Sequence, residues 1–409
     1  MKILHVITES NLGGAQRNTL LTIRGLAELG CEVHLACGAY GPGDATALVR
    51  EAEESGIKVW QITSLARPVN LKRDLAASFA LARLLRREKY DVVHTHSTKA
   101  GMIGRVVAWL CRTPVIIHTF HGVPFDTRRE NWKTRLCFIA ERFFCLFCHR
   151  LVSVGDVLRG ELIEHRVARA AKIVTIHSGV DFSSLEPGSL DAAADPQAIR
   201  RELGLPEGAK VVGFVGRLAE QKAPDILLTA FALVRKQVPA AHLLMIGEGP
   251  LHGRLAAQVH GQGLEGCVHL LGERSDVPRL LAAMHVFALP SRWEGVGRSL
   301  TEAMYMRLPA VTTGVNGVPE LVQDRETGLI IKGDDPADAA EKIVMLLGDP
   351  GLARTLGQAA HEKVKNLMSA EVMVDQTMKL YSELAQQLSL PRKTQGGKQR
   401  VWNMRHVEN

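Results

Sequence analysis

Short apolar runs rich in β-branched residues alternate with longer stretches of helical periodicity along nearly the whole chain. Parallel strands need long crossover connections, and helices usually supply them, so this alternation predicts an α/β fold with parallel sheets covered on both faces. The expected strands are Ile3–Thr8, Glu32–Ala36, Lys58–Ile62, Asp91–Thr95, Val115–Thr119, Arg150–Val154, Lys172–Ile176, Lys210–Val215, His242–Ile246, Val268–Leu271, Val286–Leu289, Ala310–Thr313 and Gly328–Ile330. Expected helices include Gln16–Leu29, Leu71–Glu88, Ala100–Cys111 and Ile226–Lys236.

The alternation breaks once, over residues 178–208, which are rich in Gly, Pro, Ser, Asp and Ala. This stretch is typical of a linker or of a loop-rich start to a second domain. We expect two doubly wound domains, over residues 1–180 and 181–370, with ligands bound beyond the carboxyl ends of their strands. A final helix over about 371–388 is expected to pack back on the first domain, and residues 391–409 to form a basic, disordered tail.

Charge is divided unequally between the two halves. The net charge of +7 comes from residues 1–185, where basic side chains outnumber acidic ones by eight. Such a half points to an anionic partner, which can be a phosphate-bearing molecule, a nucleic acid or a membrane surface, although an ordinary soluble surface is the alternative. No segment has the length and apolarity of a membrane span, and His5 and Glu9 interrupt the region where a signal peptide would be apolar. We therefore expect a cytoplasmic protein.

The segment Cys145–His149 matches the pattern by which c-type haem is attached. Haem attachment needs export, and the alternative is that the two cysteines pack as small apolar residues on a helix. Packing is the favoured interpretation.

Histidines gather after two neighbouring expected strands, at His94, His96, His118 and His121. Adjacent strand ends bring these four side chains near one another, so a metal site is one interpretation. Few carboxylates and no cysteine accompany them, and we expect no metal. His121, which precedes a glycine, is interpreted as a polar group at the mouth of a cleft that binds substrate hydroxyls.

Glycine-containing loops follow the first strand of each expected domain. Gly13 and Gly14, just before a helix that carries Arg17, allow the backbone to approach an anion, although a plain tight turn is the alternative. After Gly216, the pair Arg217 and Lys222 is suited to a diphosphate, with exposed, solvated cations as the alternative.

The most specific loop runs from Pro290 to the helix expected to start near Ser299. Glu294 lies in the loop, where no helix cap needs it, and Gly295 and Gly297 free backbone N–H groups beside a helix N-terminus. Glu302 follows Ser299 by three residues, so a capping box is its structural alternative. Two carboxylates beside an anion-binding turn suit a ligand with phosphates and hydroxyls, which describes a nucleotide sugar.

These motifs together resemble the family 4 retaining glycosyltransferases of GT-B fold, also described as glycosyltransferase group 1, which act in bacterial cell-surface polysaccharide and lipopolysaccharide synthesis. The resemblance rests on two glutamates eight positions apart, Glu294 and Glu302, on Gly216-Arg217 with Lys222, on Gly247–Gly249 and on Gly13-Gly14. It extends from the first strand to about Leu388. The implied fold has two Rossmann-like domains that face each other across a cleft.

The resemblance also implies roles for individual residues. Arg217 and Lys222 would neutralise the leaving diphosphate, Glu294 would hold the donor sugar and Glu302 the ribose, while His121 would contact the reacting sugar or acceptor. Arg298 departs from the family pattern, which often has an aliphatic residue there. The implied donor-binding set is Gly13, Gly14, Gly216, Arg217, Lys222, Gly247, Glu294, Gly295, Val296, Gly297, Arg298 and Glu302. Acceptor contacts are expected from Arg17, Lys99 and His121.

The implied reaction is metal-independent and cofactor-free transfer of a sugar, with a UDP-sugar favoured over a GDP-sugar, to a phosphorylated or lipid-linked glycan. A basic, apolar segment with Arg128, Arg129, Lys133, Arg135, Arg142 and Arg150 suggests contact with an anionic membrane, although internal packing of the same helix is the alternative. No nucleic-acid partner is expected, and oligomeric state is left open. Two rival functions are a nucleotide-sugar epimerase of the same fold and a non-catalytic binding protein.

Overall fold

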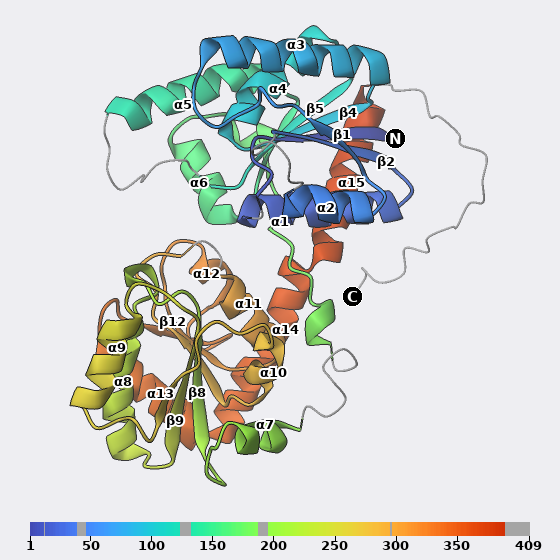
Figure 1. Ribbon diagram of the computed structural model, residues 1–409. Helices are drawn as coiled ribbons and strands as arrows, with labels where there is room; N and C mark the ends of the chain where they lie inside the picture. The colour runs from blue at the N-terminus through green and yellow to red at the C-terminus, as the bar shows by residue number, and fades with distance from the viewer. Residues whose placement is uncertain (12, 39–45, 123–131, 187–194, 295–296, 389–409) are drawn as a thin grey trace.

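The computed structural model describes residues 1–11, 13–38, 46–122, 132–186, 195–294 and 297–388, with only the backbone of 132–135. It contains two parallel sheets, each covered by helices on both faces (Figure 1). The seven-stranded sheet has the order β3-β2-β1-β4-β5-β6-β7, and the six-stranded sheet has the order β10-β9-β8-β11-β12-β13. The predicted α/β, doubly wound fold class is confirmed.

Each strand expected from the sequence is present, with ends that differ by at most one residue. In the first sheet the strands are β1 (Lys2–Ile7), β2 (Glu32–Cys37), β3 (Lys58–Gln61), β4 (Val92–His96), β5 (Val115–Phe120), β6 (Arg150–Ser153) and β7 (Ile173–Thr175). In the second they are β8 (Lys210–Val215), β9 (Ala241–Ile246), β10 (Val268–Leu270), β11 (Val286–Leu289), β12 (Ala310–Thr313) and β13 (Leu329–Ile331).

Helices connect the strands and cover the sheets. Around the first sheet lie α1 (Gly14–Glu28), α2 (Ala47–Glu54), α3 (Leu71–Glu88), α4 (Thr98–Leu110), α5 (Trp132–Phe144) and α6 (Asp156–Glu164). Around the second lie α7 (Pro196–Glu202), α8 (Pro224–Gln237), α9 (His252–Gly261), α10 (Val277–Ala282), α11 (Arg298–Tyr305), α12 (Val318–Leu321), α13 (Pro336–Gly348) and α14 (Pro350–Met368), and α15 (Ala370–Gln387) ends the described chain. Within the described residues, no helix combines the length and apolarity that crossing a membrane requires.

The pleat of the first sheet separates two apolar cores. Leu4 and Val6 of β1 belong to a core shared with α3 and α4, whereas Ile3 and Ile7 belong to a core shared with α1, α2 and α15. Successive side chains of a strand point to opposite faces, so both faces of β1 are buried. This is why the strand is a nearly continuous apolar run rather than an alternating one.

Helix α15 returns from the second domain to the first and packs against α1 (Figure 1). Its Tyr381 is fully buried in the core that contains Ile3 and Ile23. The chain therefore passes between the domains twice, and the two passages touch: Val180 N donates to Met368 O at 2.7 Å and Ala370 N to Val180 O at 3.1 Å. The stretch after 178 is the start of the second domain, because Phe182 and Leu185 belong to its core.

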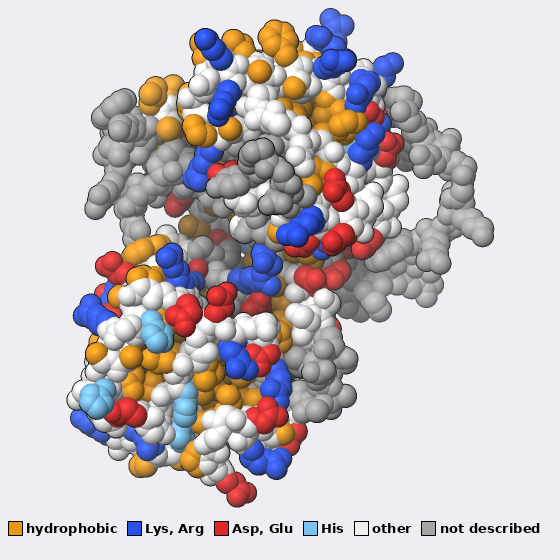
Figure 2. Space-filling view, in the orientation of Figure 1, with side chains coloured by type: hydrophobic (Ala, Val, Ile, Leu, Met, Phe, Trp, Pro, Cys, Tyr) orange, Lys and Arg blue, Asp and Glu red, His pale blue; other side chains and the backbone are white. Residues whose placement is uncertain are grey.

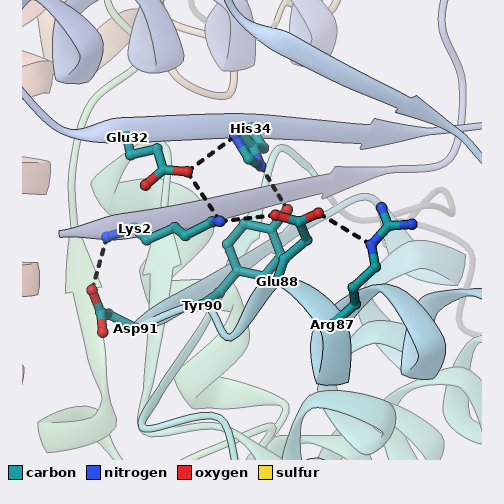
Figure 3. A network of polar contacts seen from close by, with 7 residues as sticks. All are labelled: Lys2, Glu32, His34, Arg87, Glu88, Tyr90 and Asp91. Atoms are coloured by element: carbon teal, nitrogen blue, oxygen red, sulfur yellow. Dashed lines mark hydrogen bonds and ion pairs between the residues drawn. The ribbon is translucent and has the colours of Figure 1, made fainter.

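A polar network fixes the amino edge of the first sheet (Figure 3). The Lys2 amine lies 2.8 Å from Glu88 and 3.0 Å from Glu32, and the Lys2 backbone N–H donates to Asp91 at 2.8 Å. These contacts join β1, β2 and the connection between α3 and β4. They lie at the opposite end of the strands from the loops that carry the predicted site.

The cysteines of the haem-like pattern are packed inside the first domain. Cys145 and Cys148 are buried, and burial raises the pKa of the Cys145 thiol to about 12. They lie in and just after a short 3₁₀ helix, η1 (Cys145–Phe147), that follows α5 rather than in α5 itself. The His149 ring accepts a hydrogen bond from Ile116 N at 3.0 Å. These contacts support the packing interpretation.

One side chain of the second domain caps a helix of the first. Helix α6 starts after Gly155, which has no side chain to cap it, and Glu320 of α12 accepts from Asp156 N at 2.9 Å and Val157 N at 2.8 Å. His177 bonds the same carboxylate at 2.9 Å. Burial alone would raise the pKa of Glu320, but the bonds from His177 and the two amides lower it overall. Glu320 of the second domain thus caps a helix of the first domain and joins the two domains.

We expect Glu320→Ala to lower the apparent melting temperature by about 2–4 °C, because loss of a helix cap costs about 1 kcal/mol. A lowered pKa means that the stabilisation is present above the ordinary glutamate pKa and is lost as the pH falls through the lowered value, so the difference should shrink in acid. Thermal unfolding at several pH values measures it. Glu326→Ala, an exposed glutamate near the same helix, is the control. Equal melting temperatures for all three proteins at pH 7 would contradict the capping role.

Candidate active site

The predicted site residues gather at the two points where strand order reverses. In the first sheet the chain leaves β1 toward β2 on one side and β4 lies on the other, and in the second sheet β8 has the same relation to β9 and β11. Helices on either side of such a point cross to opposite faces of the sheet, which leaves a crevice at the carboxyl ends. The surface is hollowed between the two domains (Figure 2).

Lys222 and Glu294 form an ion pair in the second domain. Lys222 ends the short 3₁₀ helix η4 (Glu220–Lys222) after β8, and Glu294 lies in the loop after β11. The two loops meet because β8 and β11 are hydrogen-bonded neighbours. Both side chains are largely buried, with 15% and 7% of their surfaces exposed. The predicted cation and carboxylate therefore belong to one unit.

The bonds to Glu294 leave part of it available. Ser291 Oγ donates to Glu294 Oε2 at 3.1 Å, and Lys222 contacts the same oxygen. The Glu294 backbone N–H donates to Asn316 Oδ1 at 3.3 Å, which fixes the loop from the neighbouring β12 side. Within the described residues, Oε1 thus keeps its lone pairs for a ligand. An ammonium group has three donors, so Lys222 also retains hydrogen-bonding capacity.

Arg217 is placed differently. Its side chain is exposed beside Gly216, and among the described residues it has no ion pair. An unpaired cation two residues after a buried strand, next to a lysine that is already oriented, can approach an anion without first breaking an internal bond. Arg217 and Lys222 thus differ in their freedom, although the sequence presents them as similar.

Two glycines are needed because two loops nearly touch. A Cβ on Gly247 would lie 2.1 Å from Gly216 O, and Gly247 has φ +132°, a conformation that other residues rarely adopt. A Cβ on Gly249 would lie 2.4 Å from Leu218 O. The Gly247–Gly249 segment therefore braces the loop that carries Arg217.

Helix α11 does not form the capping box that was the structural alternative for Glu302. Its N-cap is Gly297, with φ +78°, and the helix starts at Arg298, so Ser299 already lies inside the first turn. The Glu302 carboxylate instead accepts from Arg298 Nε at 2.7 Å. Arg298, which departs from the family pattern, thus forms an ion pair with the carboxylate predicted to bind ribose. Gly295 and Val296 lie outside the described residues.

Sequence reasoning missed Arg292, which joins the loops of this site. Its guanidinium bonds both oxygens of Asp225, at 3.1 and 3.3 Å, and Asp334 at 2.9 Å. Its backbone N–H donates to Gln221 O at 2.8 Å. Hydrogen bonds to Asp225 raise the pKa of Arg292 against its partial burial. The only available signal was its position next to Glu294; its partner Asp225 lies 67 residues away along the chain.

In the first domain, the loop after β1 leads into α1. Gly13 is the N-cap in extended conformation, and Gln16 Oε1 accepts from Gly13 N at 3.2 Å. Arg17 is exposed on the first turn. Lys99, predicted to contact the acceptor, lies 2.6 Å from Asp74 and also bonds the Pro68 carbonyl. Lys99 thus holds the segment before α3 against α4, and binding an acceptor would require it to exchange these partners.

The histidines divide between the two faces of the first sheet. His94 and His96 point to the face covered by α15, together with His5 of β1, whereas His118 points toward α4 and bonds Thr95 Oγ1 at 2.9 Å. The expectation that all four predicted histidines form one group is therefore wrong for His118. The pleat and the register give the reason: residues two apart share a face, and His118 pairs across the strands with Thr95, which faces away from His94 and His96.

His121 is connected to this buried group. Its Nε2 lies 2.9 Å from His96 Nδ1, and burial lowers the pKa of His121 to about 4. The rings of His5, His94 and His96 are close enough to hold a metal ion. However, all six of their ring nitrogens already have hydrogen-bond partners. His5 bonds His96 and Tyr381, His94 bonds Tyr381 and Thr119, and His96 bonds His5 and His121.

A second group of possible metal ligands is Asp156, His177 and Glu320. Both oxygens of Glu320 already accept backbone N–H groups at the start of α6. The structure thus accounts for this group as the contact between the domains.

Comparison with known proteins identifies the family. The model "Glycosyltransferase Family 4" matches residues 12–184, and "Glycosyl transferases group 1" matches residues 195–363. The D-inositol 3-phosphate glycosyltransferase of Corynebacterium efficiens is 31% identical over 72% of this chain and 72% of its own length. The UDP-Gal:alpha-D-GlcNAc-diphosphoundecaprenol alpha-1,3-galactosyltransferase of Escherichia coli is 28% identical over 94% of this chain and 97% of its own length.

Solved structures show the same fold. HepE of Anabaena, crystallised in complex with UDP, has a TM-score of 0.78 at 22% identity and covers 94% of this chain and all (100%) of its own. WaaG, a glycosyltransferase involved in lipopolysaccharide biosynthesis, has a TM-score of 0.65 at 17% identity, over 93% and 100% of the two chains. The predicted GT-B fold is confirmed. The chain belongs to the group 1, or family 4, glycosyltransferases.

We expect Gly247→Ala to lower the apparent melting temperature by more than about 5 °C and to weaken nucleotide binding. The added Cβ combines an unfavourable φ with a clash against Gly216 O, and each costs about 1–3 kcal/mol. Gly253→Ala, in the first turn of α9 with open space around it, should be neutral or slightly stabilising. Equal unfolding of the two variants would show that the loops are not packed as described.

Proposed function

We propose that this glycosyltransferase moves a sugar from a UDP-sugar to a phosphorylated or lipid-linked glycan, with retention of anomeric configuration. The observation that carries the proposal is the Lys222–Glu294 pair, held on neighbouring loops beside the unpaired Arg217. One arrangement thus offers cations for a diphosphate and a carboxylate oxygen for sugar hydroxyls.

The main electrostatic task is to stabilise the leaving group. When the bond between the donor's C1 and its phosphate oxygen breaks, the electron pair stays with the diphosphate, and Lys222 and Arg217 neutralise the added charge. The acceptor hydroxyl oxygen bonds C1 from the same face, and its proton passes to a phosphate oxygen of the leaving group. Glu294 holds Lys222 in place and turns its second oxygen to the donor sugar.

The remaining donor contacts follow from the helix start at α11. Glu302 would accept from the ribose hydroxyls, and Arg298, already bonded to it, either orients this carboxylate or adds a contact to the donor. Gly297 places the N-terminus of α11 toward the same loop, where backbone N–H groups favour phosphate. Gly13 and Gly14 would do the same from α1.

The choice of UDP is supported by the relatives. The name of the E. coli relative specifies UDP-Gal as donor and a GlcNAc-diphosphoundecaprenol as acceptor, and HepE was crystallised with UDP. The acceptor proposed here is therefore a glycan on a diphosphate-linked lipid. Such an acceptor agrees with the excess of eight positive charges over residues 1–185. His121 and Arg17 are the proposed acceptor contacts.

We expect Lys222→Ala to lower kcat by about 100-fold or more, since preorganised charges at a leaving group contribute about that much. The substitution also leaves the buried Glu294 carboxylate without its cation, so the melting temperature should fall too, and kcat is compared at a temperature where the variant is fully folded. Lys236→Ala, which removes an exposed charge from the same domain, should leave kcat within twofold of wild type. Transfer is measured with UDP- and GDP-sugars and a polyprenyl-diphosphate glycan, and both nucleotide and glycosylated product are quantified. Near-wild-type kcat in Lys222→Ala contradicts the proposal. Donor consumed without glycosylated product indicates the epimerase, and binding without turnover indicates a non-catalytic protein.

We further propose that the first domain docks on an anionic membrane surface. Most of the exposed large apolar side chains gather on α3, the end of α4, α5 and η1: Leu71, Leu75, Phe79, Trp109, Leu110, Leu136, Ile139, Phe143 and Leu146. Leu71, Leu75 and Phe79 are spaced by four and form one stripe along α3. Trp109 and Phe143 each contact the Phe147 ring, with centroids 5.3 Å apart, which joins α4 to α5.

Cations accompany this apolar face. On α3, Lys72, Arg73, Arg83 and Arg86 are exposed, and Figure 2 shows hydrophobic and basic side chains side by side over the top of the first domain. Below α5, a cavity of about 920 Å³ is lined by the basic residues Arg142, Arg150, Arg166, Arg169 and Lys172. No acidic residue lines it, and among the described residues none of these cations has an ion pair. The chemistry fits the phosphates of anionic lipids, with apolar side chains at their acyl boundary.

This surface is broader than the one expected from sequence. The sequence prediction placed it on one segment, of which Arg128 and Arg129 lie outside the described residues and Lys133 and Arg135 are described only as backbone. Helix α5 has both buried and exposed apolar side chains: Phe138 is buried in the core, whereas Ile139 is 59% exposed. Internal packing and membrane contact therefore do not compete for one face of this helix.

We expect the wild-type protein to co-sediment with vesicles of phosphatidylcholine and phosphatidylglycerol at low salt, and Leu75→Ser/Phe79→Ser to bind at least about tenfold more weakly. Each lost apolar side chain removes about 1.5–3 kcal/mol of possible burial, of which shallow insertion realises only a part. Leu29→Ser, an exposed apolar residue of the same domain, is the control. Pure phosphatidylcholine vesicles should bind weakly. Equal sedimentation with both vesicle types, or none at low salt, contradicts the proposal.

A further inference from the structure

A continuous chain of hydrogen bonds runs from His121 into the interior of the first domain. His121 Nε2 lies 2.9 Å from His96 Nδ1, and His96 Nε2 lies 2.9 Å from His5 Nδ1. His5 Nε2 contacts the hydroxyl of Tyr381 at 3.3 Å. The same hydroxyl lies 2.5 Å from His94 Nδ1.

The chain of bonds ends on the first sheet. His94 Nε2 contacts Thr119 Oγ1 at 2.6 Å. Four separate parts of the sequence therefore supply the members, namely β1, β4, the end of β5 with its following loop, and helix α15. Apart from His121, the residues of this hydrogen-bond chain are at most 4% exposed. Apart from Tyr381, they come from strand positions two apart or from paired strands, on the face that α15 covers.

Burial keeps the histidines of this hydrogen-bond chain neutral. It lowers the pKa of His5 to about 3 and that of His121 to about 4, and it lowers the pKa values of His94 and His96 well below the ordinary range. It also raises the pKa of Tyr381 well above its ordinary value. A neutral imidazole has one N–H donor and one acceptor nitrogen, and a tyrosine hydroxyl has one proton.

These proton counts link all the bonds in the chain. If His121 Nε2 donates to His96, then His96 must donate to His5, His5 to Tyr381, and Tyr381 to His94. If Tyr381 instead donates to His5, each imidazole bond on that side reverses, and His96 donates to His121. A mixed arrangement would leave two protons, or none, between one pair of atoms.

The direction of the chain decides what His121 offers to a ligand. In the first direction its Nδ1 is an acceptor for a sugar hydroxyl. In the second direction Nδ1 carries the proton and is a donor. Because the pKa of His121 lies near 4, protonating the ring to gain both donors is unfavourable at neutral pH.

We propose that Tyr381 is a positioning residue that sets the tautomer of His121 through His5 and His96. The proposal rests on the acceptor- or sugar-contacting role of His121 in the proposed function. It gives α15 a part in the active site, because the helix that returns from the donor domain supplies the hydroxyl that orients a ring about to meet substrate. Release of α15 from the first sheet would separate Tyr381 from both His5 and His94.

The test compares two single-oxygen changes on α15. Tyr381→Phe removes the hydroxyl from the chain, while Thr377→Val removes a buried hydroxyl one turn earlier that bonds only Met373 O at 2.8 Å among the described residues. Both changes nearly conserve volume, and both proteins are first checked for equal thermal unfolding. We expect Tyr381→Phe to lower kcat by about tenfold or more at unchanged donor KM, and Thr377→Val to stay within twofold of wild type.

The second readout does not depend on turnover. Imidazole ¹⁵N NMR shifts distinguish the two neutral tautomers, and His121 is assigned with His121→Gln. In wild type and Thr377→Val, we expect His121 and His96 each to hold one tautomer between pH 6 and pH 8. In Tyr381→Phe, we expect both to shift toward a mixture, because the direction is no longer imposed. Unchanged tautomers in Tyr381→Phe overturn the proposal.

The two readouts separate this proposal from the proposed function. If His121→Gln retains full transfer activity, the catalytic use of His121 is wrong, but the NMR comparison still decides whether Tyr381 sets the tautomer. If Tyr381→Phe lowers kcat while both tautomers stay as in wild type, Tyr381 acts by another route and the proposed coupling is wrong.

Discussion

Parallel pairing brings the carboxyl ends of β8 and β11 side by side, and the Lys222–Glu294 contact depends on it. The two residues are 72 positions apart in the chain. Pairing between Val286 and Val212 aligns the strands, and each strand then ends in a loop that the next helix fixes. The same relation in the first sheet brings the loops after β1, β4 and β5 together. Nearly all proposed contacts to substrate are thus consequences of strand order.

Burial distinguishes the charged groups that are held in an ion pair from those that remain exposed to solvent. Desolvation makes a buried ion pair costly unless further hydrogen bonds support it, and Ser291 Oγ donates one to Glu294 Oε2. Asn316 Oδ1 accepts from the Glu294 backbone N–H and so holds the loop itself. Lys222 is thereby oriented before any ligand arrives. Arg217 remains exposed, so it can follow the charge of a diphosphate that enters. One cation is oriented by an ion pair, and the other is exposed and has no ion pair among the described residues; both are proposed to neutralise charge on the departing group.

In the first domain, buried neutral side chains are proposed to orient a site residue through hydrogen bonds rather than through charge. Its buried histidines are neutral because desolvation disfavours the imidazolium form. Each neutral ring donates one hydrogen bond and accepts another, so the donor direction of one bond fixes that of the next. Helix α15 completes this arrangement with one hydroxyl. The two chain passages at Val180 and Ser369, together with the Glu320 cap on α6, connect the same helix and sheet to the second domain.

The sequence by itself determined the strands, the doubly wound fold class and the loops of the site. Strand and helix periodicities are local, and Gly247 and Gly297 mark turns with positive φ that other residues rarely adopt. It did not reveal that Arg292 bonds Asp225, that Lys99 is occupied by Asp74, or that Arg298 rather than a helix cap engages Glu302. Those contacts join side chains through space, and whether a charge is free depends on its neighbours.

The histidines illustrate the same division most clearly. The spacing of two within β4 places His94 and His96 on one face, but the register between β4 and β5, which pairs His118 with Thr95, decides that His118 faces the other way. That Tyr381 of the last helix lies between His5 and His94 could not be read from the sequence. Only the packing of α15 against the sheet, which buries a polar hydroxyl and requires it to find partners, decided that.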